Sequence, residues 1–289
     1  MNKLSFIRLV LLQIILVSCA MTGRSPASPL EVKHLVLDID WTIVSEIKDP
    51  NVKVNPTSRV VEVQGIRYFI NEGLEELIEN ALKFPDVKIS FFSGGKKVRN
   101  EELLSKIKLS NGKSLKDIST HILNAEDLVK NPSASEGAKF AERFKKDLRL
   151  VGQNLAQIIM LDDTPNFVLD TFEKQSDSVF FIGKAFEYFD KFEDTIGLRG
   201  EYVPLNYDSW FLNRKKLYIL SEAFKASYFE AQTGACTLLE CMKKREAKLD
   251  LKSHNWNSYS RLLYSKALRS MEKFPEDNCL DLVSQLITL

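Results

Sequence analysis

A pair of aspartates, Asp38 and Asp40, constrains the fold of this chain more than any other feature, because it ends an apolar, strand-like run over residues 35–39. Residues two apart in a strand point to the same face of a sheet. Continuing the strand would bury unpaired charge, so we expect the chain to leave the sheet there. Open α/β sheets bind ligands at the carboxyl edge of their strands. The pair therefore predicts an α/β fold with a site at that edge, although on its own it also fits an ordinary strand-to-loop junction.

Two carboxylates so close together suit phosphoryl chemistry. Hard cations such as Mg²⁺ favour carboxylate oxygens and would offset the repulsion between Asp38 and Asp40. One carboxylate could then attack a phosphoryl group while the other moves protons.

Two further apolar runs end in polar residues of matching chemistry. Residues 88–92 lead into Ser93, Gly94 and Gly95, and residues 158–161 lead into Asp162 and Asp163. An acid pair, a Ser, a Lys and a second acid pair, in that order, form the four-part pattern of the haloacid-dehalogenase (HAD) superfamily. The motifs are weak singly and specific as an ordered set.

Within that superfamily the chain resembles the RNA polymerase II C-terminal-domain phosphatases and the NLI-interacting-factor family. Residues 38–44 read D-I-D-W-T-I-V against the family's D-L-D-E-T-L-V, and residues 71–78 read N-E-G-L-E-E-L-I against R-P-G-L-x-E-F-L. Residues 146–155, K-D-L-R-L-V-G-Q-N-L, precede L-D-D-T-P at 161–165, as in the family. The resemblance covers roughly residues 33–190. It implies a HAD-like Rossmannoid parallel sheet flanked by helices, with a small β insertion after the first motif.

The resemblance also implies a mechanism. Asp38 would form an aspartyl-phosphate, and Asp40 would serve as the general acid and base. Asp162 and Asp163 would hold Mg²⁺ together with Asp38 and the Asp40 carbonyl. The residues given a role are, for catalysis, Asp38, Asp40, Ser93 and Lys146; for phosphate binding, Ser93, Gly94 and Lys146; and for the metal, Asp38, Asp40, Asp162 and Asp163.

Several nearby residues leave alternatives open. Lys116 is a rival for the lysine role, but the link from Lys146 to the last acid motif matches the family without a gap. Lys96, Lys97 and Arg99 could attract an anionic substrate, and a solvated helix start is the favoured interpretation. Trp41 stands where the family usually has Glu and could shape access to the site.

The amino terminus has the pattern of a secretory signal. Lys3 and Arg8 precede an apolar stretch that is too short for a stable membrane span, and residues 16–19 (L-V-S-C) resemble a bacterial lipobox. We expect a signal peptide over 1–18, lipidation of Cys19, a tether over 19–32 and an exported bacterial lipoprotein on the cell membrane or outer membrane, facing the periplasm or exterior. A plain secretory signal with an incidental cysteine is the alternative.

Composition argues against several other classes of function. The 40 basic and 39 acidic residues are nearly balanced, so there is no charge excess to indicate nucleic-acid binding. The three histidines and the cysteine spacing fit neither a phosphohistidine nor a cysteine phosphatase. Cys236, Cys241 and Cys279 cannot all pair within one chain, so a disulfide to Cys279 and buried free thiols both stay open.

The chain divides into a HAD-like phosphatase domain over 33–200 and a helical extension over 201–289 that we expect to pack on it. Residues 43–70 are predicted to form the β insertion, residues 72–84 a helix and residues 100–145 a largely helical lid. Further elements are expected as follows: strands at 87–92, 157–161 and 178–182, and helices at 136–149, 213–232, 238–249, 258–274 and 279–287.

The predicted function is a membrane-anchored, Mg²⁺-dependent phosphomonoester hydrolase acting on a phosphorylated small molecule or peptide. One alternative is a broad-specificity lipoprotein acid phosphatase of the HAD type. Another is a surface lipoprotein that uses a HAD scaffold for binding without catalysis, with the helical extension as its interaction element.

Overall fold

A five-stranded parallel sheet, in the order β10-β9-β1-β5-β6, forms the centre of the fold. The structure is a computed structural model that describes residues 31–48, 54–170 and 174–271. The expected signal peptide, Cys19 and the helix at 279–287 lie outside these residues. The parallel α/β sheet expected from the sequence is confirmed. Its strands are β1 (Lys33–Leu37), β5 (Val87–Phe92), β6 (Ser119–Leu123), β9 (Ile158–Asp162) and β10 (Val179–Phe181).

The central strand β1 is buried on both faces, as a near-continuous apolar sequence requires. Leu35 and Leu37 belong to a large apolar cluster that includes side chains of the helices on one side. Val36 points the other way and packs in a second cluster with Leu148 and Met160. The alternation along one strand therefore divides the core in two, and Asp38 follows at the carboxyl end of this central strand.

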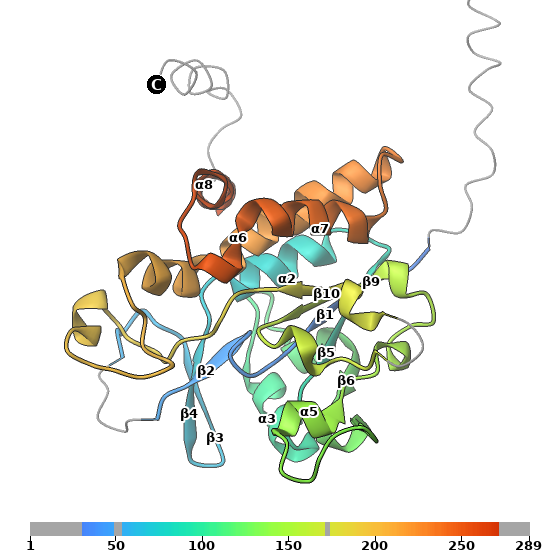
Figure 1. Cartoon of the computed structure of the whole chain (residues 1–289). Coiled ribbons are helices and arrows are strands. Elements are labelled where there is room, and N and C mark those ends of the chain that lie inside the picture. The colour runs from blue at the N-terminus through green and yellow to red at the C-terminus, as the bar shows by residue number, and fades with distance from the viewer. Residues whose placement is uncertain (1–30, 49–53, 171–173, 272–289) are drawn as a thin grey trace, which may run out of the picture. The chain divides into compact units, whose positions relative to one another are not determined.

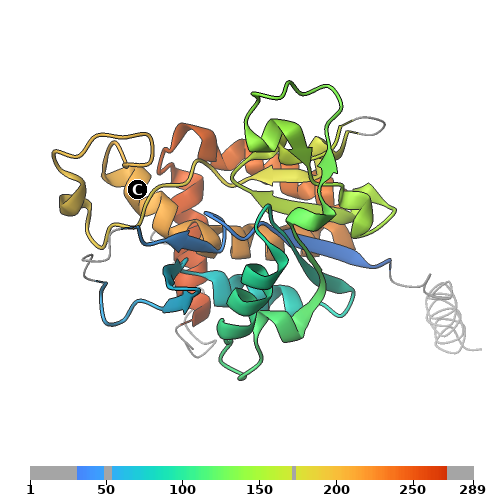
Figure 2. The same cartoon turned by 90° about the horizontal axis from the view of Figure 1, so that it is seen from below.

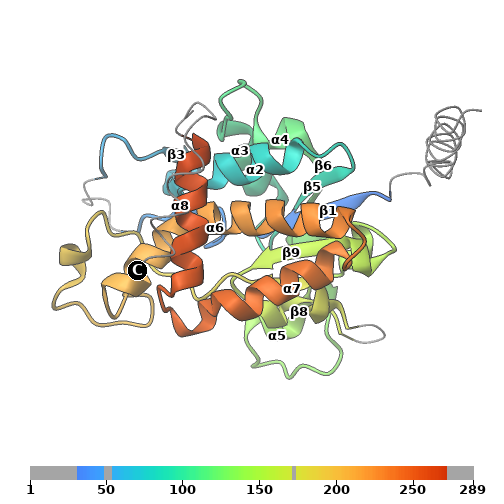
Figure 3. The same cartoon turned by 90° about the horizontal axis from the view of Figure 1, so that it is seen from above.

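Helices cover the sheet on both sides. Figure 3 shows α2, α6 and α7 side by side over one face, while α3 and α5 lie toward the other side (Figures 1 and 2). The two turn-length helices, α4 and α5, belong to the segment between β5 and β9. The α-helices are α2 (Leu74–Leu82), α3 (Lys97–Lys106), α4 (Leu115–Ile118), α5 (Phe140–Arg143), α6 (Tyr207–Gln232), α7 (Leu238–Leu249) and α8 (Ser258–Met271).

A small antiparallel sheet, in the order β2-β4-β3, follows directly on the end of β1. Its strands are β2 (Val44–Glu46), β3 (Val60–Val63) and β4 (Ile66–Ile70). This is the β insertion expected over residues 43–70, although the sequence signal missed the first strand.

The segment between β5 and β9 differs from the sequence prediction. Residues 100–145 were expected to be largely helical, yet they include β6 and a two-stranded ribbon of β7 (Val129–Lys130) and β8 (Phe144–Lys145). The helix expected over 136–149 is also wrong, since only the single turn of α5 forms there. Apolar spacing favoured a long helix, but Phe140 lies in the single turn of α5, where it packs against Phe144 and Phe167.

The C-terminal helices pack on the core through α6, which lies along α2. Polar contacts add to this packing: Asn80 donates to Ser221 and Tyr228 donates to Asp86. At Gly73, which has a positive φ of 86°, an added Cβ would lie 2.5 Å from the Tyr218 backbone nitrogen. Glycine is therefore required there both by the backbone conformation and by the close approach of α6.

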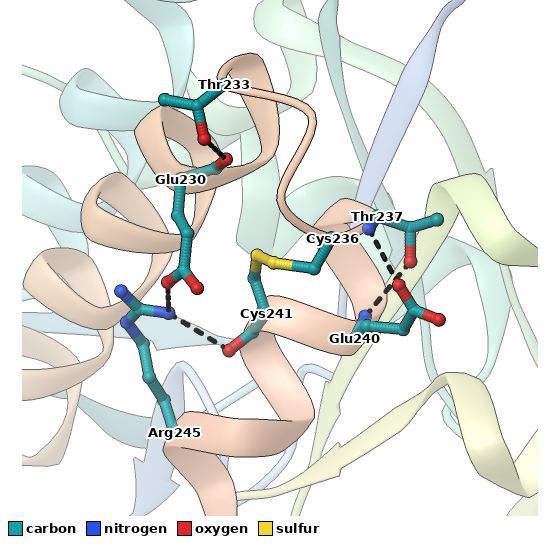
Figure 4. Close-up of a disulfide and its surroundings, with 7 residues drawn as sticks. All are labelled: Glu230, Thr233, Cys236, Thr237, Glu240, Cys241 and Arg245. Carbon is teal, nitrogen blue, oxygen red and sulfur yellow. Dashed lines mark hydrogen bonds and ion pairs between the residues drawn. A yellow bond between two sulfur atoms is a disulfide. The ribbon is translucent and has the colours of Figure 1, made fainter.

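A disulfide joins Cys236 to Cys241 at the turn from α6 into α7 (Figure 4). Arg245 holds this turn as well, because its guanidinium pairs with Glu230 and donates to the Cys241 carbonyl. The expectation of buried free thiols is therefore wrong for this pair. Within the described ranges, no helix has the length and hydropathy that a bilayer span requires.

Candidate active site

A buried lysine joins two of the predicted acidic motifs. The Lys146 ammonium lies 2.7 Å from Asp38 Oδ1 and 2.7 Å from Asp162 Oδ2. Its side chain is 0% exposed, and it lies over the ring of Phe167, 4.7 Å from the centroid. Burial of an ammonium is costly unless it is paired and hydrogen-bonded, and here both conditions are met by carboxylates.

The backbone explains why these three side chains converge. Asp38 follows β1 and its N–H donates to the Leu161 carbonyl, which places it beside the end of β9. Lys146 lies on extended chain, where it forms an isolated parallel bridge with Val168. Its N–H donates to Phe167 and its carbonyl accepts from Leu169, and these bonds fix the direction of the side chain. Lys146 was expected on a helix, but it reaches the site from a strand-like segment.

Burial and mutual charge govern the ionisation of these groups. Burial raises the pKa of Asp38 well above its usual range, although the Lys146 ammonium acts to lower it. Burial alone would lower the pKa of Lys146, but the charges of Asp162 and Asp38 outweigh it and raise that pKa. The lysine is thus held as an ammonium, in the form that attracts phosphoryl oxygens.

Asp163 completes an acidic cluster. Burial, followed by the charge of Asp162, raises the pKa of Asp163 to about 6. Ligand atoms of Asp38, Asp162 and Asp163 all lie within 4.8 Å of one another. Oxygens bound to one Mg²⁺ lie about 2.1 Å from it and hence about 3–4 Å from each other. The donor chemistry and the spacing of this cluster therefore fit a hard divalent cation.

Asp40 turns away from that cluster toward the loop after β5. Its Oδ2 accepts from Ser93 Oγ at 3.1 Å and pairs with the Arg99 guanidinium at 2.5 Å. Ser93 Oγ also accepts from the Gly95 N–H at 2.9 Å. At Gly94, a Cβ would lie 3.0 Å from the Phe140 ring, so the loop is closely packed. Arg99 is mostly buried and charge-paired, so the favoured interpretation of a solvated helix start is wrong for this residue, whereas Lys96 and Lys97 are exposed as expected.

Asn71 holds the loop that carries Asp40 through the carbonyls of two successive residues. Trp41 has a positive φ of 65°, which is uncommon for a bulky residue. The Asn71 side chain donates to the Thr42 carbonyl at 2.8 Å, and the Asn71 N–H donates to the Ile43 carbonyl at 2.9 Å. Asn71 is the first residue of the N-E-G-L segment noted in the sequence, and its position explains why that segment matters here.

Helix α6 supplies a second buried lysine, Lys216, which sequence reasoning missed. Its ammonium donates to the Trp41 carbonyl at 3.3 Å, and it interacts electrostatically with Asp163 and Asp38. The helical periodicity of 213–232 places position 216 on the apolar face. A lysine on an apolar face is unusual, and this is the sequence signal that could have identified Lys216. By contrast, the rival Lys116 pairs with Glu101 on α3.

Comparisons with solved structures found distant similarity to an RNA polymerase II phosphatase. The fission yeast RNA polymerase II CTD phosphatase Fcp1 bound to beryllium fluoride is 17% identical, with a TM-score of 0.37. A second structure, of Fcp1 as an essential RNA polymerase II CTD phosphatase, is 15% identical with the same score. Each alignment covers 84% of this chain but 64% of the other, so this chain spans less than two thirds of those proteins.

No curated protein matches the chain. The family model of the NLI interacting factor-like phosphatases matches residues 33–195, which is more than half of the sequence. The match spans the acidic cluster, the loop after β5 and Lys146. The chain therefore belongs to the NLI interacting factor-like phosphatase family.

Proposed function

We propose that this protein is a Mg²⁺-dependent phosphomonoester hydrolase that acts through an aspartyl-phosphate on Asp38. The observation that carries the proposal is the position of the Lys146 ammonium, 2.7 Å from carboxylate oxygens of both Asp38 and Asp162. An ammonium in this position would orient Asp38 and would supply a positive charge to a phosphoryl group bound beside it.

In the first step, a carboxylate oxygen of Asp38 forms a bond to phosphorus as the ester P–O bond breaks. Asp40 gives its proton to the leaving oxygen. In the second step, water attacks phosphorus, Asp40 takes the proton of that water, and the bond to Asp38 breaks to release phosphate. Ser93 is placed to orient Asp40 because its hydroxyl donates to Oδ2. When bound, Mg²⁺ would neutralise charge on the carboxylates of Asp38, Asp162 and Asp163 and on the phosphoryl oxygens.

The test is turnover of p-nitrophenyl phosphate by the purified protein, with Mg²⁺ and after EDTA. Turnover should require the metal and be lost in Asp38→Asn. Asp40→Asn should slow turnover about 100- to 10,000-fold, the range that general acid–base groups contribute. Asp177→Asn, an exposed aspartate away from the cluster, is the matched control. Mass analysis of acid-quenched enzyme should find the phosphoryl adduct on the peptide that contains Asp38. Metal-independent turnover that survives in Asp38→Asn would refute the mechanism.

We further propose that the protein is membrane-anchored through a lipidated Cys19. The leader composition and the L-V-S-C sequence at 16–19 support this. Intact-mass analysis of the membrane fraction should show an acylated chain that begins at Cys19. A chain cleaved at another residue and found only in the soluble fraction would show that the anchor does not exist.

A further inference from the structure

Lys216 is a charged residue in a place where an apolar one would be expected. It lies on α6, beyond residues 33–195 that the family model matches. The residue is 2% exposed and is among the largest fully buried side chains of the described residues. An ammonium removed from water needs strong partners, so its burial calls for an explanation.

Its hydrogen bonds connect the helix to the loop after β1. Nζ donates to the Trp41 carbonyl at 3.3 Å and to Asn213 Oδ1 at 3.2 Å. Both acceptors are neutral oxygens. Among the residues that the structure describes, these two are the hydrogen-bond partners of the Lys216 ammonium. The Trp41 carbonyl belongs to the peptide group between Trp41 and Thr42, so this contact holds the backbone one residue after Asp40, which is proposed as acid and base.

The two residues before Lys216 fix α6 to other parts of the core. Arg214 and Lys215 both pair with Glu72, and Arg214 also donates to the carbonyls of Phe189 and Asp190. Because the two residues that precede it are held in this way, Lys216 has little freedom to move away from Trp41. The helix therefore presents its ammonium to the loop as a fixed donor.

The acidic cluster offsets part of the cost of burying the Lys216 charge. Burial lowers the pKa of Lys216 to about 8, while the charges of Asp163 and Asp38 act to raise it. In return, Lys216 acts to lower the pKa of Asp163. The group is thus coupled to the carboxylates that fit a divalent cation, although its hydrogen bonds go elsewhere.

We propose that Lys216 is a positioning residue of the phosphatase site: it holds the Trp41 carbonyl and so fixes the loop that carries Asp40, and its positive charge offsets that of the Asp38–Asp162–Asp163 cluster. This inference rests on the proposed function. It means that the C-terminal extension completes the site. It also means that the affinity for Mg²⁺ is set partly from outside the family-matched region.

The two proposed roles of Lys216, as a hydrogen-bond donor and as a positive charge, predict different experimental results. Loss of the donor should misplace Asp40 and lower kcat more than it changes KM. Loss of the charge should tighten the binding of Mg²⁺, because a positive charge near the carboxylates opposes that of the metal ion. A residue that served only to pack the core would not tighten metal binding when it is replaced.

The experiment compares Lys216→Met, which keeps the length and apolar stem, with Lys216→Gln, which keeps a donor without the charge. Lys225→Met is the control, since Lys225 lies on the same helix and pairs with Glu222 at a more exposed site. Calorimetric titration with Mg²⁺ alone, at pH 7 and without substrate, should show binding tightened roughly three- to tenfold in both Lys216 variants. In Lys216→Met, kcat should fall about 10- to 100-fold, with a smaller loss in Lys216→Gln.

The Mg²⁺ titration requires no turnover, so its result does not depend on whether the proposed function is correct. A wild-type protein that hydrolyses no phosphomonoester would refute that function, yet the Mg²⁺ titration would still decide whether Lys216 is coupled to the cluster. Unchanged kcat in Lys216→Met, or unchanged or weaker Mg²⁺ binding in both variants, would overturn the inference. If circular dichroism shows that neither variant folds, Lys216 serves folding alone and the inference fails.

Discussion

Arg99 and Ser93 contact the same carboxylate oxygen, Oδ2 of Asp40. The arginine comes from the first turns of α3, and Tyr68 lies beneath its guanidinium, 5.8 Å from the ring centroid. A charged donor at this position keeps the Asp40 side chain directed at the loop after β5. In the proposed mechanism, the direction of this side chain decides whether its proton reaches the leaving oxygen.

We predict that Arg99→Met slows turnover of p-nitrophenyl phosphate roughly 100-fold, the low end of what general acid–base groups contribute. The protein should remain folded, because the arginine side chain is not part of the apolar core. Steady-state kinetics with Lys97→Met as the control would check this, since Lys97 is exposed and pairs on the surface with Glu101. Equal losses in the two variants would show a general effect of surface charge and would argue against a specific role for Arg99.

The sequence could reveal the site residues whose position is fixed by a strand end. Asp38 directly follows β1 and Asp162 is the last residue of β9, so their placement follows from the sheet. Arg99 and Lys216 could not be found in this way. Their roles depend on how helices α3 and α6 are rotated and docked, which is set by packing between segments far apart in the chain.

At the scale of elements, α6 is held against the core by an ion-pair cluster around Glu72. Burial alone would raise the pKa of Glu72, but hydrogen bonds and charges from Lys215 and Arg214 outweigh it and lower that pKa. A carboxyl whose pKa is lower in the folded state stabilises the fold above its unfolded pKa. That stabilisation disappears as the pH falls through the folded value.

We therefore predict that Glu72→Gln lowers the free energy of unfolding by about 1–2 kcal/mol at pH 7, as expected for hydrogen bonds to a charged group at a partly buried site. The difference from wild type should shrink as the pH drops below about 4.3, the usual value for Glu. Urea denaturation at pH 7 and at pH 3.5 would measure it. A difference that stays constant with pH would mean that the ion pairs do not stabilise the docking of α6.

Two glycines with positive φ offer a matched test of how closely α6 approaches the core. Gly65 has a φ of 78° and nothing within 4 Å of an added Cβ, whereas at Gly73 the Tyr218 nitrogen lies 2.5 Å away. Gly65→Ala should cost only backbone strain, about 1 kcal/mol. Gly73→Ala should cost about 3 kcal/mol or more, because the helix must also shift. Chemical denaturation of both variants would check this, and equal losses would contradict the close approach.

The elements that the sequence predicted well are those with a strong period. Strand β5 and helix α7 match their expected bounds, and α2 lies within the range expected for it. Strand β6 was missed because it is a short edge strand whose polar residues, such as Ser119 and His121, give no clear alternation. The helix predicted over 136–149 failed because its apolar residues, including Phe140, are used for loop packing at the site.

At the scale of the whole molecule, the α/β core and the C-terminal helices share one apolar cluster. Leu217, Leu220 and Phe224 of α6 are buried in the same apolar cluster as Leu77 and Ile78 of α2. We predict that a chain ending at Arg199 aggregates and loses most of its turnover, because this surface of α2 would be exposed to water. Size-exclusion chromatography and p-nitrophenyl phosphate hydrolysis would check it. A soluble, fully active truncation would show that the extension is a separate module.

The close contact between Gly73 and Tyr218 has a consequence for exchanging parts between relatives. Gly73 lies in the region that the family model covers, while Tyr218 belongs to the region beyond it. An atom added at position 73 would meet the backbone of α6, which cannot move aside as a flexible side chain could. A chimera that joins the catalytic half of another family member to this helical half will therefore fold only if the donor also has glycine at that position and leaves the same space for the helix backbone.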